Sequence, residues 1–259
     1  MTTVLALANQ KGGVGKTTTA VNLGAALANR GHEVLLVDID PQANATSALG
    51  MRAPDGASSY PMLLGAKSLE STVLATGCER LFLAPSSAEL AGAEVELTTL
   101  MAREYRLKQA FDGVLDRYAF VIIDCPPSLG LLTVNALTAA QDVLVPVQCE
   151  YLALEGLSQL TQTLELVRRN LNPDLKLRGL LLTMFDRRTS LSHQVADEVR
   201  RHFPNTFRAV IPRSVRVSEA PSHGLPINAY DPRSPASAAY DALAEEMLES
   251  VGAAAEVVS

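Results

Sequence analysis

The sequence predicts an α/β domain built on a mostly parallel, twisted sheet with helices on both faces. Short apolar runs alternate with longer amphipathic stretches, which is typical of parallel strands joined by crossover helices. The runs are almost uniformly apolar rather than alternating, as expected for strands buried on both faces. The 259 residues are 47% hydrophobic and 19% charged, a composition that favours a single packed domain over residues 1–259.

The first predicted elements are a strand, a glycine-rich loop and a helix. Val4–Ala8 is apolar enough for a buried strand. Thr17–Asn29 carries Leu23 and Leu27 on one face, and Gly31 stands just beyond its end, as helix termini favour. Further strands are predicted at Glu33–Asp38, Leu81–Ala84, Phe120–Asp124, Val143–Val147, Leu177–Met184 and Ala209–Ile211.

Two parts of the chain carry weaker patterns. Residues 51–76 contain two prolines and two glycines, which predict loops and short helices. Residues 236–259 predict a helix and then become rich in alanine. The sequence leaves disorder open for the tail from about residue 250.

The net charge of −6 is unevenly distributed. Between Arg178 and Arg233 there are nine arginines, no lysine and five acidic residues, so this segment carries +4 and the remainder −10. Coating of nucleic acid by the whole surface is therefore excluded, and any DNA contact needs a local patch. No apolar run reaches the ~18 residues that span a bilayer, and no basic leader precedes the first strand. We therefore expect a cytoplasmic protein with no membrane partner.

A phosphate-binding loop follows the first predicted strand. Residues 10–18 read QKGGVGKTT and lead directly into a helix, so successive backbone N–H groups can face phosphate oxygens. Lys16 is predicted to bridge the β- and γ-phosphates of ATP, and the Thr17 hydroxyl to bind Mg²⁺. The predicted nucleotide-binding residues of this loop are Lys11, Gly12, Gly13, Val14, Gly15, Lys16, Thr17 and Thr18.

The loop departs from the strict P-loop pattern at its start. Gln10 stands where a glycine is usual, and a second lysine, Lys11, precedes the glycines. KGGVGKT resembles the deviant Walker A motif of the ParA/MinD class of P-loop NTPases. The resemblance implies that Lys11 reaches across a dimer to the partner's nucleotide, because a cation in trans offsets the charge of two facing ATP molecules. It therefore implies a homodimer in the ATP-bound state.

Acidic residues are predicted at the carboxyl ends of two strands, where ligands bind in sheets of this kind. Asp38 and Asp40 follow the second strand, and by resemblance to the family's DxDPQ segment Asp40 would orient the attacking water and Asp38 would lie behind Mg²⁺. A purely structural Asp38 is the alternative. Asp124 ends the run VIID, which matches a Walker B segment. The predicted catalytic residues are Lys11, Lys16 and Asp40, and the predicted metal residues are Thr17, Asp38 and Asp124.

Two later segments narrow the resemblance to the ParA/Soj-type DNA-partition ATPases. LTMFDRRT at residues 182–189 and IPRSVRVSEAPSHG at residues 211–224 resemble segments of that family. The resemblance implies that Met184 and Pro212 pack on adenine, with ordinary core residues as the alternative. Ser214 departs from the family's usual Asn, which leaves a base or ribose contact from that side chain unsupported.

Arginines in the same region match positions at which the family contacts DNA. The predicted DNA-binding residues are Arg188, Arg213, Arg216 and Arg233. The guanidinium suits phosphate, and no base-reading module is found, so binding should be nonspecific and salt-sensitive. A solvated rim of arginines is the alternative. The resemblance also implies a nucleoid-associated location, a low basal turnover and stimulation by a ParB-type partner.

Three other functions share this kind of P-loop. A MinD-like membrane positioner usually ends in a basic amphipathic helix, whereas residues 239–249 hold four acidic residues and no basic one. A nitrogenase iron-protein-like reductase needs cysteines that share a cluster, an arrangement that Cys78 and Cys125 do not match. A ParA-like ATPase that positions a cargo other than DNA is not separated by the sequence.

Overall fold

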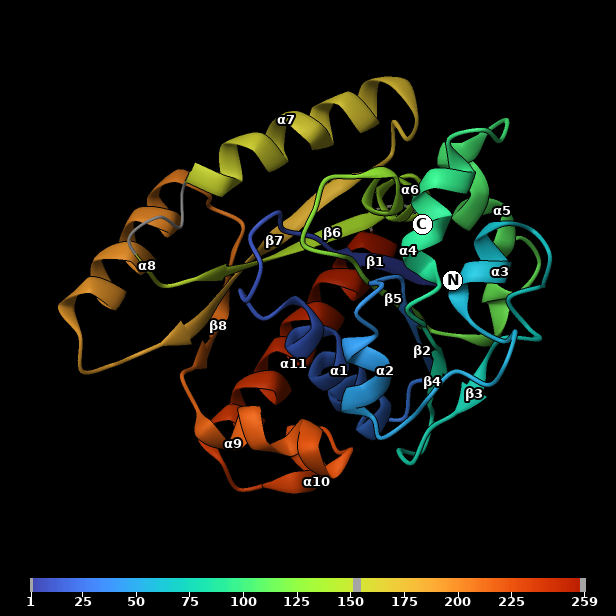
Figure 1. The fold of residues 1–259 in the computed structure, drawn as a ribbon. Helices are drawn as coiled ribbons and strands as arrows, with labels where there is room; N and C mark the ends of the chain where they lie inside the picture. The colour runs from blue at the N-terminus through green and yellow to red at the C-terminus, as the bar shows by residue number, and fades with distance from the viewer. Residues whose placement is uncertain (1, 151–154, 257–259) are drawn as a thin grey trace.

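The computed structural model describes residues 2–150 and 155–256. An eight-stranded sheet runs through the middle of the molecule in the order β3-β4-β2-β5-β1-β6-β7-β8 (Figure 1). Its pairs are parallel except for β3 with β4, which is antiparallel. The predicted α/β class and mostly parallel sheet are therefore confirmed.

Every strand predicted from the sequence is present, with ends shifted by a few residues. The strands are β1 (Thr3–Leu7), β2 (Val34–Asp38), β3 (Leu74–Ala75), β4 (Leu81–Ala84), β5 (Phe120–Asp124), β6 (Asp142–Gln148), β7 (Lys176–Phe185) and β8 (Thr206–Pro212). The sequence did not predict β3, because two residues at a sheet edge produce no periodic pattern.

The helices connect these strands and cover the two faces of the sheet. The α-helices are α1 (Lys16–Asn29), α2 (Asn44–Ala48), α3 (Ser59–Leu63), α4 (Leu90–Leu97), α5 (Arg106–Phe111), α6 (Leu131–Ala139), α7 (Glu155–Asn170), α8 (Ser190–His202), α9 (Val215–Glu219), α10 (Ile227–Tyr230) and α11 (Pro235–Glu256). The 3-10 helices are η1 (Arg103–Tyr105), η2 (Leu115–Arg117) and η3 (Ala220–His223). The described part of the tail is helical past residue 250, and residues 257–259 lie outside the described residues.

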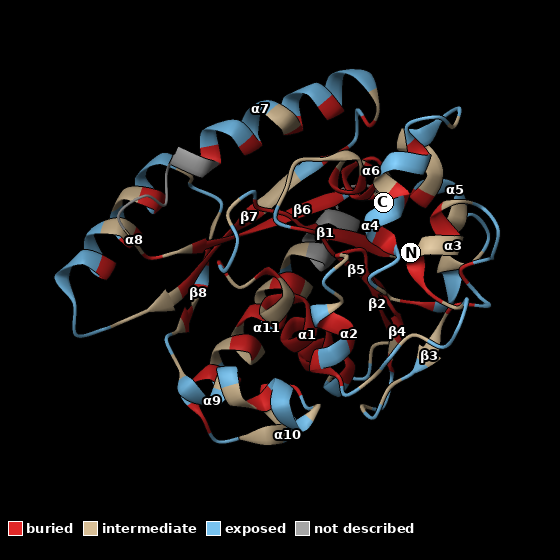
Figure 2. Cartoon of the chain, in the orientation of Figure 1, coloured by how far each residue is buried: buried red, intermediate tan, exposed pale blue. Residues whose placement is uncertain are grey.

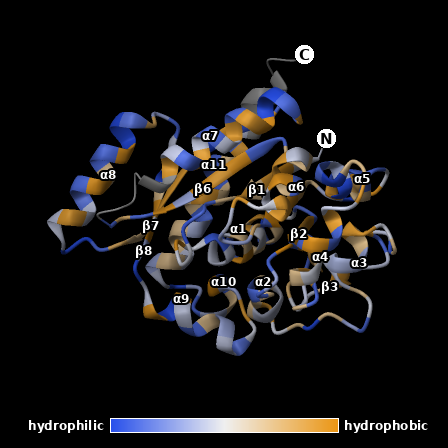
Figure 3. Cartoon of the chain, turned by 45° about the horizontal axis from the view of Figure 1, so that its top comes forward, coloured by the Kyte–Doolittle hydropathy of each residue, from blue (hydrophilic) through white to orange (hydrophobic). Residues whose placement is uncertain are grey.

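Two hydrophobic cores sandwich the sheet, one on each face. Helices α1, α2, α10 and α11 pack on one face, and α3 to α8 pack on the other (Figure 1). Figure 2 shows the central strands buried, and Figure 3 shows them hydrophobic along their length. Burial on both faces explains why the strand sequences are uniformly apolar. No helix in the described ranges is long and apolar enough to cross a membrane.

The strand order brings the acidic residues at the strand ends together at the carboxyl-terminal side of the sheet. Strand β5 lies between β1 and β2, with Asp124 in register with Leu7 on one side and Asp38 on the other. The carboxyl ends of these three strands therefore meet beside the start of α1. An opening at such a point is where parallel α/β sheets bind ligands.

Candidate nucleotide site

The phosphate loop between β1 and α1 has the backbone shape that its glycines allow. Gly13 and Gly15 have φ of +74° and +90°, in the left-handed region that disfavours side chains. Thr183 of β7 donates a hydrogen bond from Oγ1 to the carbonyl oxygen of Val14 at 2.8 Å. A Cβ added to Gly15 would lie 3.7 Å from the same threonine side chain. Strand β7 therefore braces the tightest part of the loop.

Asn9 fixes the beginning of the loop to the sheet. Its Nδ2 donates to the carbonyl oxygen of Pro146 in β6 at 2.8 Å, and its Oδ1 accepts from the backbone N–H of Lys11 at 3.0 Å. The sequence analysis missed both Asn9 and Thr183. Nothing in the pattern marks them, because each acts through one hydrogen bond to a residue far along the chain.

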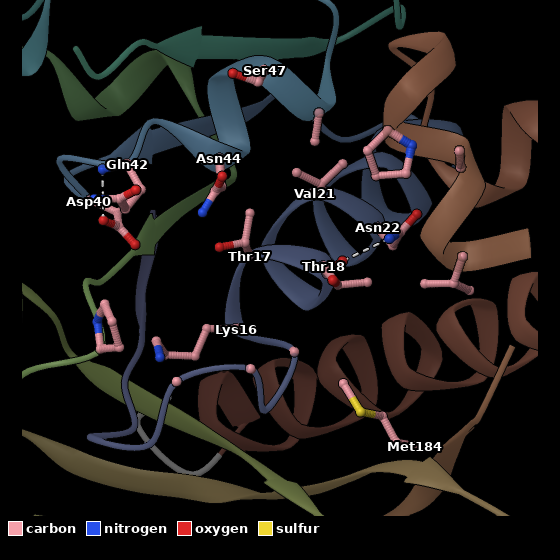
Figure 4. Close-up of a pocket in the computed structure, with 18 of the residues that line it drawn as sticks. Lys16, Thr17, Thr18, Val21, Asn22, Asp40, Gln42, Asn44, Ser47 and Met184 are labelled. Atoms are coloured by element: carbon pink, nitrogen blue, oxygen red, sulfur yellow. Dashed lines mark hydrogen bonds between the residues drawn. The ribbon is translucent and has the colours of Figure 1, made fainter. Parts of the chain in front are cut away.

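A cavity of about 440 Å³ opens beside this loop, within the size range of small-molecule sites. Figure 4 shows Lys16, Thr17 and Asp40 facing a common space at one end, with Met184 farther along. The lining residues are Gly12, Gly13, Gly15, Lys16, Thr17, Thr18, Val21, Asn22, Asp40, Gln42, Asn44, Ser47, Ala48, Pro127, Met184, Val217, Ala220, Pro221 and Leu225. The structure thus brings most of the predicted loop residues together with Asp40 and Met184.

Lys16 is the buried cation of the cavity. Its side chain is only 6% exposed, and its Nζ donates to the carbonyl oxygen of Lys11 at 3.2 Å. Burial lowers the pKa of Lys16, while the nearby carboxylate of Asp124 raises it and so opposes the shift. An ammonium group held at the mouth of a phosphate loop is placed to exchange its carbonyl partner for phosphate oxygens.

Lys11 and Val14 differ from the rest of the predicted loop set because neither lines the cavity. The Val14 side chain is buried, so this residue can offer a ligand only its backbone. Lys11 is half-buried and forms no ion pair within the described ranges. Its ammonium group is therefore not committed to the cavity of its own chain.

Three carboxylates lie at the phosphate end in two layers. Asp40 lines the cavity, whereas Asp38 and Asp124 are fully buried behind it. Asp38 accepts hydrogen bonds from the Thr46 backbone N–H at 2.9 Å and the Thr46 hydroxyl at 2.7 Å. Burial raises the pKa of Asp38 to about 6 despite these donors. The pKa of Asp124 is raised well above its ordinary value, first by burial and then by the Asp38 carboxylate.

Asp124 has the environment expected of a residue that binds a cation. Both of its carboxylate oxygens are buried and accept no hydrogen bond of good geometry in the described part of the chain, although the Thr17 hydroxyl and the Lys16 ammonium group lie near enough to lower its pKa against the effect of burial. A buried unpaired carboxylate is costly unless a cation or donor accompanies the bound state. The Asp124 carboxylate and the nearby Thr17 hydroxyl are oxygen donors of the kind that would hold Mg²⁺, which keeps several waters and takes substrate phosphates as further ligands.

The unpaired carboxylate predicts an unusual effect of Asp124→Asn on stability. The carboxyl groups of Asp38 and Asp124 bind their protons more tightly in the folded chain than in the unfolded chain, where aspartates have a pKa of about 4. Stability of the nucleotide-free protein is therefore lost as pH rises from about 4 through the raised folded pKa values. We expect Asp124→Asn to raise the free energy of unfolding at pH 8 by about 1–3 kcal/mol.

Thermal denaturation at pH 5 and pH 8 checks this prediction. The gain should be largest at pH 8 and shrink at pH 5, and Asp124→Asn should lose the stabilisation that Mg²⁺ and nucleotide give the wild type. Asp116→Asn, an exposed aspartate, is the matched control. A lower melting temperature for Asp124→Asn at pH 8 contradicts the interpretation.

The far end of the cavity is apolar and suits a planar base. Met184 lines it with φ of +52°, a left-handed conformation that costs energy for a residue with a side chain and often marks a functional site. The opposite wall comes from α9, η3 and the loop after η3. The wall residues are Val217, Ala220, Pro221 and Leu225, none of which the sequence analysis selected.

Pro212 lies outside the lining of this cavity. It ends β8, in register with Phe185, which follows Met184 in β7, and it lines a separate hollow of about 920 Å³. The packing of Pro212 on the base therefore stays a prediction. Val217 and Pro221, from the segment that follows β8, line the cavity itself.

Four arginines line the separate hollow, which we call the arginine hollow. They are Arg187, Arg188, Arg208 and Arg213. The structure thus brings together two of the predicted DNA-binding residues, Arg188 and Arg213. The other two, Arg216 on α9 and Arg233 before α11, are exposed outside it.

Acidic partners accompany three of the predicted DNA-binding arginines. Arg188 donates two hydrogen bonds to Asp186, at 3.0 and 2.8 Å, which hold the pKa of Asp186 well below its usual range. Arg213 lies 3.2 Å from Glu150, and Arg216 lies 3.1 Å from Glu219. Exposed ion pairs of this kind contribute at most about 1 kcal/mol, so phosphate oxygens can displace these partners.

Comparison with known proteins agrees with the assignment of the cavity as a nucleotide site. The AAA domain family matches residues 2–177. The sporulation initiation inhibitor protein Soj of Bacillus subtilis is 55% identical over 246 residues, covering 94% of this chain and 97% of that protein. The chromosome partitioning protein ParA of Caulobacter vibrioides is 52% identical, covering 95% and 93%. The chain belongs to the ParA/Soj family of P-loop ATPases.

Solved structures of relatives share the same fold as this ParA/Soj family member. A structure named cobyrinic acid a,c-diamide synthase, from Mycobacterium smegmatis with bound ADP and magnesium, has a TM-score of 0.84 at 42% identity and covers 96% of this chain and 94% of that chain. A putative plasmid partition protein from Borrelia burgdorferi, bound to AMPPNP, has a TM-score of 0.81 at 25% identity, with 96% and 100% covered.

Asn22 is a further residue of the ParA/Soj site that the sequence did not reveal. It lines the cavity from α1, donating from Nδ2 to the Thr18 carbonyl oxygen at 2.7 Å. Its Oδ1 accepts from the backbone N–H of Ile227 at 2.6 Å. Asn22 therefore ties the first residue of α10, just after the apolar wall, to the helix of the phosphate loop.

Proposed function

We propose that this chain is a Mg²⁺-dependent ATPase of chromosome or plasmid partition. ATP binding forms a homodimer that binds double-stranded DNA without sequence specificity, and hydrolysis stimulated by a ParB-type protein returns it to the monomer. Association with the nucleoid follows from that DNA binding. The observation that carries the proposal is the cavity in which the phosphate loop, Lys16 and Asp40 meet in front of a buried, unpaired Asp124.

Each residue of the site has a separate role in phosphoryl transfer to water. Lys16 and the loop N–H groups hold the phosphates, and the Thr17 hydroxyl with Asp124 would hold Mg²⁺. Mg²⁺, when bound, neutralises charge on the phosphates. Asp40 lines the cavity and can orient the attacking water through its carboxylate, with its Oδ1 held at 2.9 Å by the Gln42 N–H. Catalysis then rests on positioning and charge, with no covalent intermediate.

The position of Lys11 supports an ATP-dependent dimer. Its side chain does not line its own cavity, and no ion pair holds it among the described residues. A cation of this kind beside the cavity mouth is available to the triphosphate of a second copy. Because this interaction exists only when nucleotide is bound, it links dimerisation to ATP.

Arginines on one chain become more effective when two chains join. Arg188, Arg213, Arg216 and Arg233 are exposed and spread over two neighbouring segments. Two copies in one dimer double the number of phosphate-binding arginines on one particle, which raises the affinity for duplex DNA through bivalency. The ATP-dependent dimer is therefore the form that we expect to bind DNA.

Binding of random-sequence duplex DNA with no nucleotide, with ADP and with ATP tests this function. We expect tight binding only with ATP, and loss of that binding in Lys16→Ala and in the double variant Arg188→Ala/Arg216→Ala. The slope of log affinity against log salt should fall by about 0.9 for each DNA phosphate that the variant no longer neutralises.

The double variant Arg168→Ala/Arg169→Ala provides the matched control. It removes the same charge from α7, which lies across the sheet from α9 (Figure 1). Its affinity for DNA should stay close to that of the wild type. Binding that ignores nucleotide, or equal losses of affinity in both double variants, contradicts the DNA role and favours a protein cargo or a lipid surface.

A further inference from the structure

Two glycines from distant parts of the chain touch beside the cavity. Gly50 follows α2 and Gly224 ends η3, and both have φ of +68°. A Cβ added to Gly224 would lie 2.8 Å from the Cα of Gly50, and a Cβ added to Gly50 would lie 3.2 Å from the Cα of Gly224. The two backbones are in direct contact, with no side chain between them that could give way.

The first glycine closes a segment, residues 40–50, that is tied to the carboxylates. Asp40 lines the cavity at its start, and Thr46 in α2 donates two hydrogen bonds to the buried Asp38, at 2.9 and 2.7 Å. Ala43, just before α2, has φ of +51°, a strained conformation for a residue with a side chain. Strain of this kind is typical of a segment that has a second arrangement.

The second glycine closes a segment, residues 215–224, that meets both the nucleotide cavity and the predicted DNA surface. Val217 and Pro221 line the cavity. Arg216 is exposed and is held by Glu219 at 3.1 Å, within the same segment. Helix α9 therefore carries a cavity residue and a predicted DNA-binding residue at adjacent positions.

We propose that the contact between Gly50 and Gly224 passes the state of the bound nucleotide from the phosphate end of the cavity to Arg216. The proposal rests on the proposed function, because the expected consequence is a change in the affinity for DNA. The base meets the wall of the cavity in ADP and ATP alike, so the γ-phosphate acts first on residues 40–50. A shift of that segment moves Gly50, and a close-packed backbone contact carries the shift to Gly224. Both glycines are thus positioning residues.

Hydrogen–deuterium exchange of Gly224→Ala tests the contact without any DNA. The added Cβ must push the two backbones apart. The matched control Gly56→Ala takes similar left-handed strain, at φ of +66°, with nothing within 4 Å of the added Cβ. Each protein is compared with Mg²⁺ and ADP and with Mg²⁺ and a non-hydrolysable ATP analogue. If Gly224→Ala does not fold, Gly50→Ala replaces it, because its added Cβ overlaps less with the opposite backbone.

In the wild type and in Gly56→Ala, the backbone amides of residues 40–50 and 215–231 should exchange about fivefold or more slowly with the analogue than with ADP. In Gly224→Ala the slowing over residues 40–50 should remain, and that over residues 215–231 should be lost. A merely structural role for the glycine would not separate the two ranges. Equal slowing over residues 215–231 in both variants, joint loss over both ranges, or no slowing there in the wild type overturns the proposal.

DNA affinity gives a second readout of the same variants. The ratio of affinity with the analogue to affinity with ADP should fall by about fivefold or more in Gly224→Ala and stay unchanged in Gly56→Ala. Sedimentation of the same samples reports dimerisation, and a fall that merely followed loss of the dimer overturns the proposal. Failure of the wild type to bind DNA contradicts the proposed function instead, and leaves the exchange result standing.

Discussion

Asp40→Ala should bind ATP about as tightly as the wild type and hydrolyse it about 100-fold more slowly. The carboxylate lines the cavity, 5% exposed, whereas the phosphates would be held by the loop and Lys16. Removing it takes away the group that orients water but no group that holds nucleotide. Single-turnover hydrolysis, together with a separate measurement of ATP affinity, separates the two effects.

Two further variants sharpen that experiment. Asp40→Asn keeps an oxygen for the Gln42 N–H, which now donates at 2.9 Å, and so preserves the loop while removing the charge. Asp55→Ala, at an exposed position, controls for loss of an aspartate. Near-normal turnover in both Asp40 variants would falsify the assignment of Asp40 to water positioning.

Lys16→Ala should lose nucleotide binding itself. The ammonium group is buried at the phosphate loop, and loss of one partner of such a charge pair costs about 2–5 kcal/mol, or roughly 30- to 4,000-fold in affinity. The nucleotide-free variant should nevertheless keep a stability close to that of the wild type. Burial opposes the charge of the ammonium group, whereas the nearby Asp124 carboxylate favours it, and the hydrogen bond from Lys16 to the Lys11 carbonyl is long, at 3.2 Å.

Titration calorimetry with ATP and Mg²⁺, followed by thermal denaturation without ligand, measures both parts of this prediction. Lys67→Ala, which removes an exposed lysine, should change neither quantity. Retained affinity in Lys16→Ala contradicts the phosphate role. A large loss of stability in the nucleotide-free variant shows instead that Lys16 is structural.

The sequence predicted those parts of the site that local pattern determines. A glycine loop between an apolar strand and a helix directs backbone N–H groups toward phosphate, so Gly13, Gly15 and Lys16 could be placed from the sequence alone. Asp38 and Asp124 could be placed at strand ends, and the strand order then made them register neighbours. That adjacency depends on β5 lying between β1 and β2, which no local pattern states.

The parts that the sequence did not predict depend on single contacts between distant residues. Thr183 donates a hydrogen bond to the loop from β7, and Asn22 holds the first residue of α10. Propensity and period describe neighbours along the chain, and these contacts join residues that are not neighbours.

The place of β1 in the sheet has a consequence for synthesis of the chain. This strand is made first, yet it lies fifth in the sheet, between β5 and β6. Its two pairing partners follow much later, since β5 ends at Asp124 and β6 at Gln148, and pairing over such sequence separations is slow. A growing chain on the ribosome therefore holds β1 unpaired until β5 has been made, and the phosphate loop that follows β1 lacks its support from the sheet in that time.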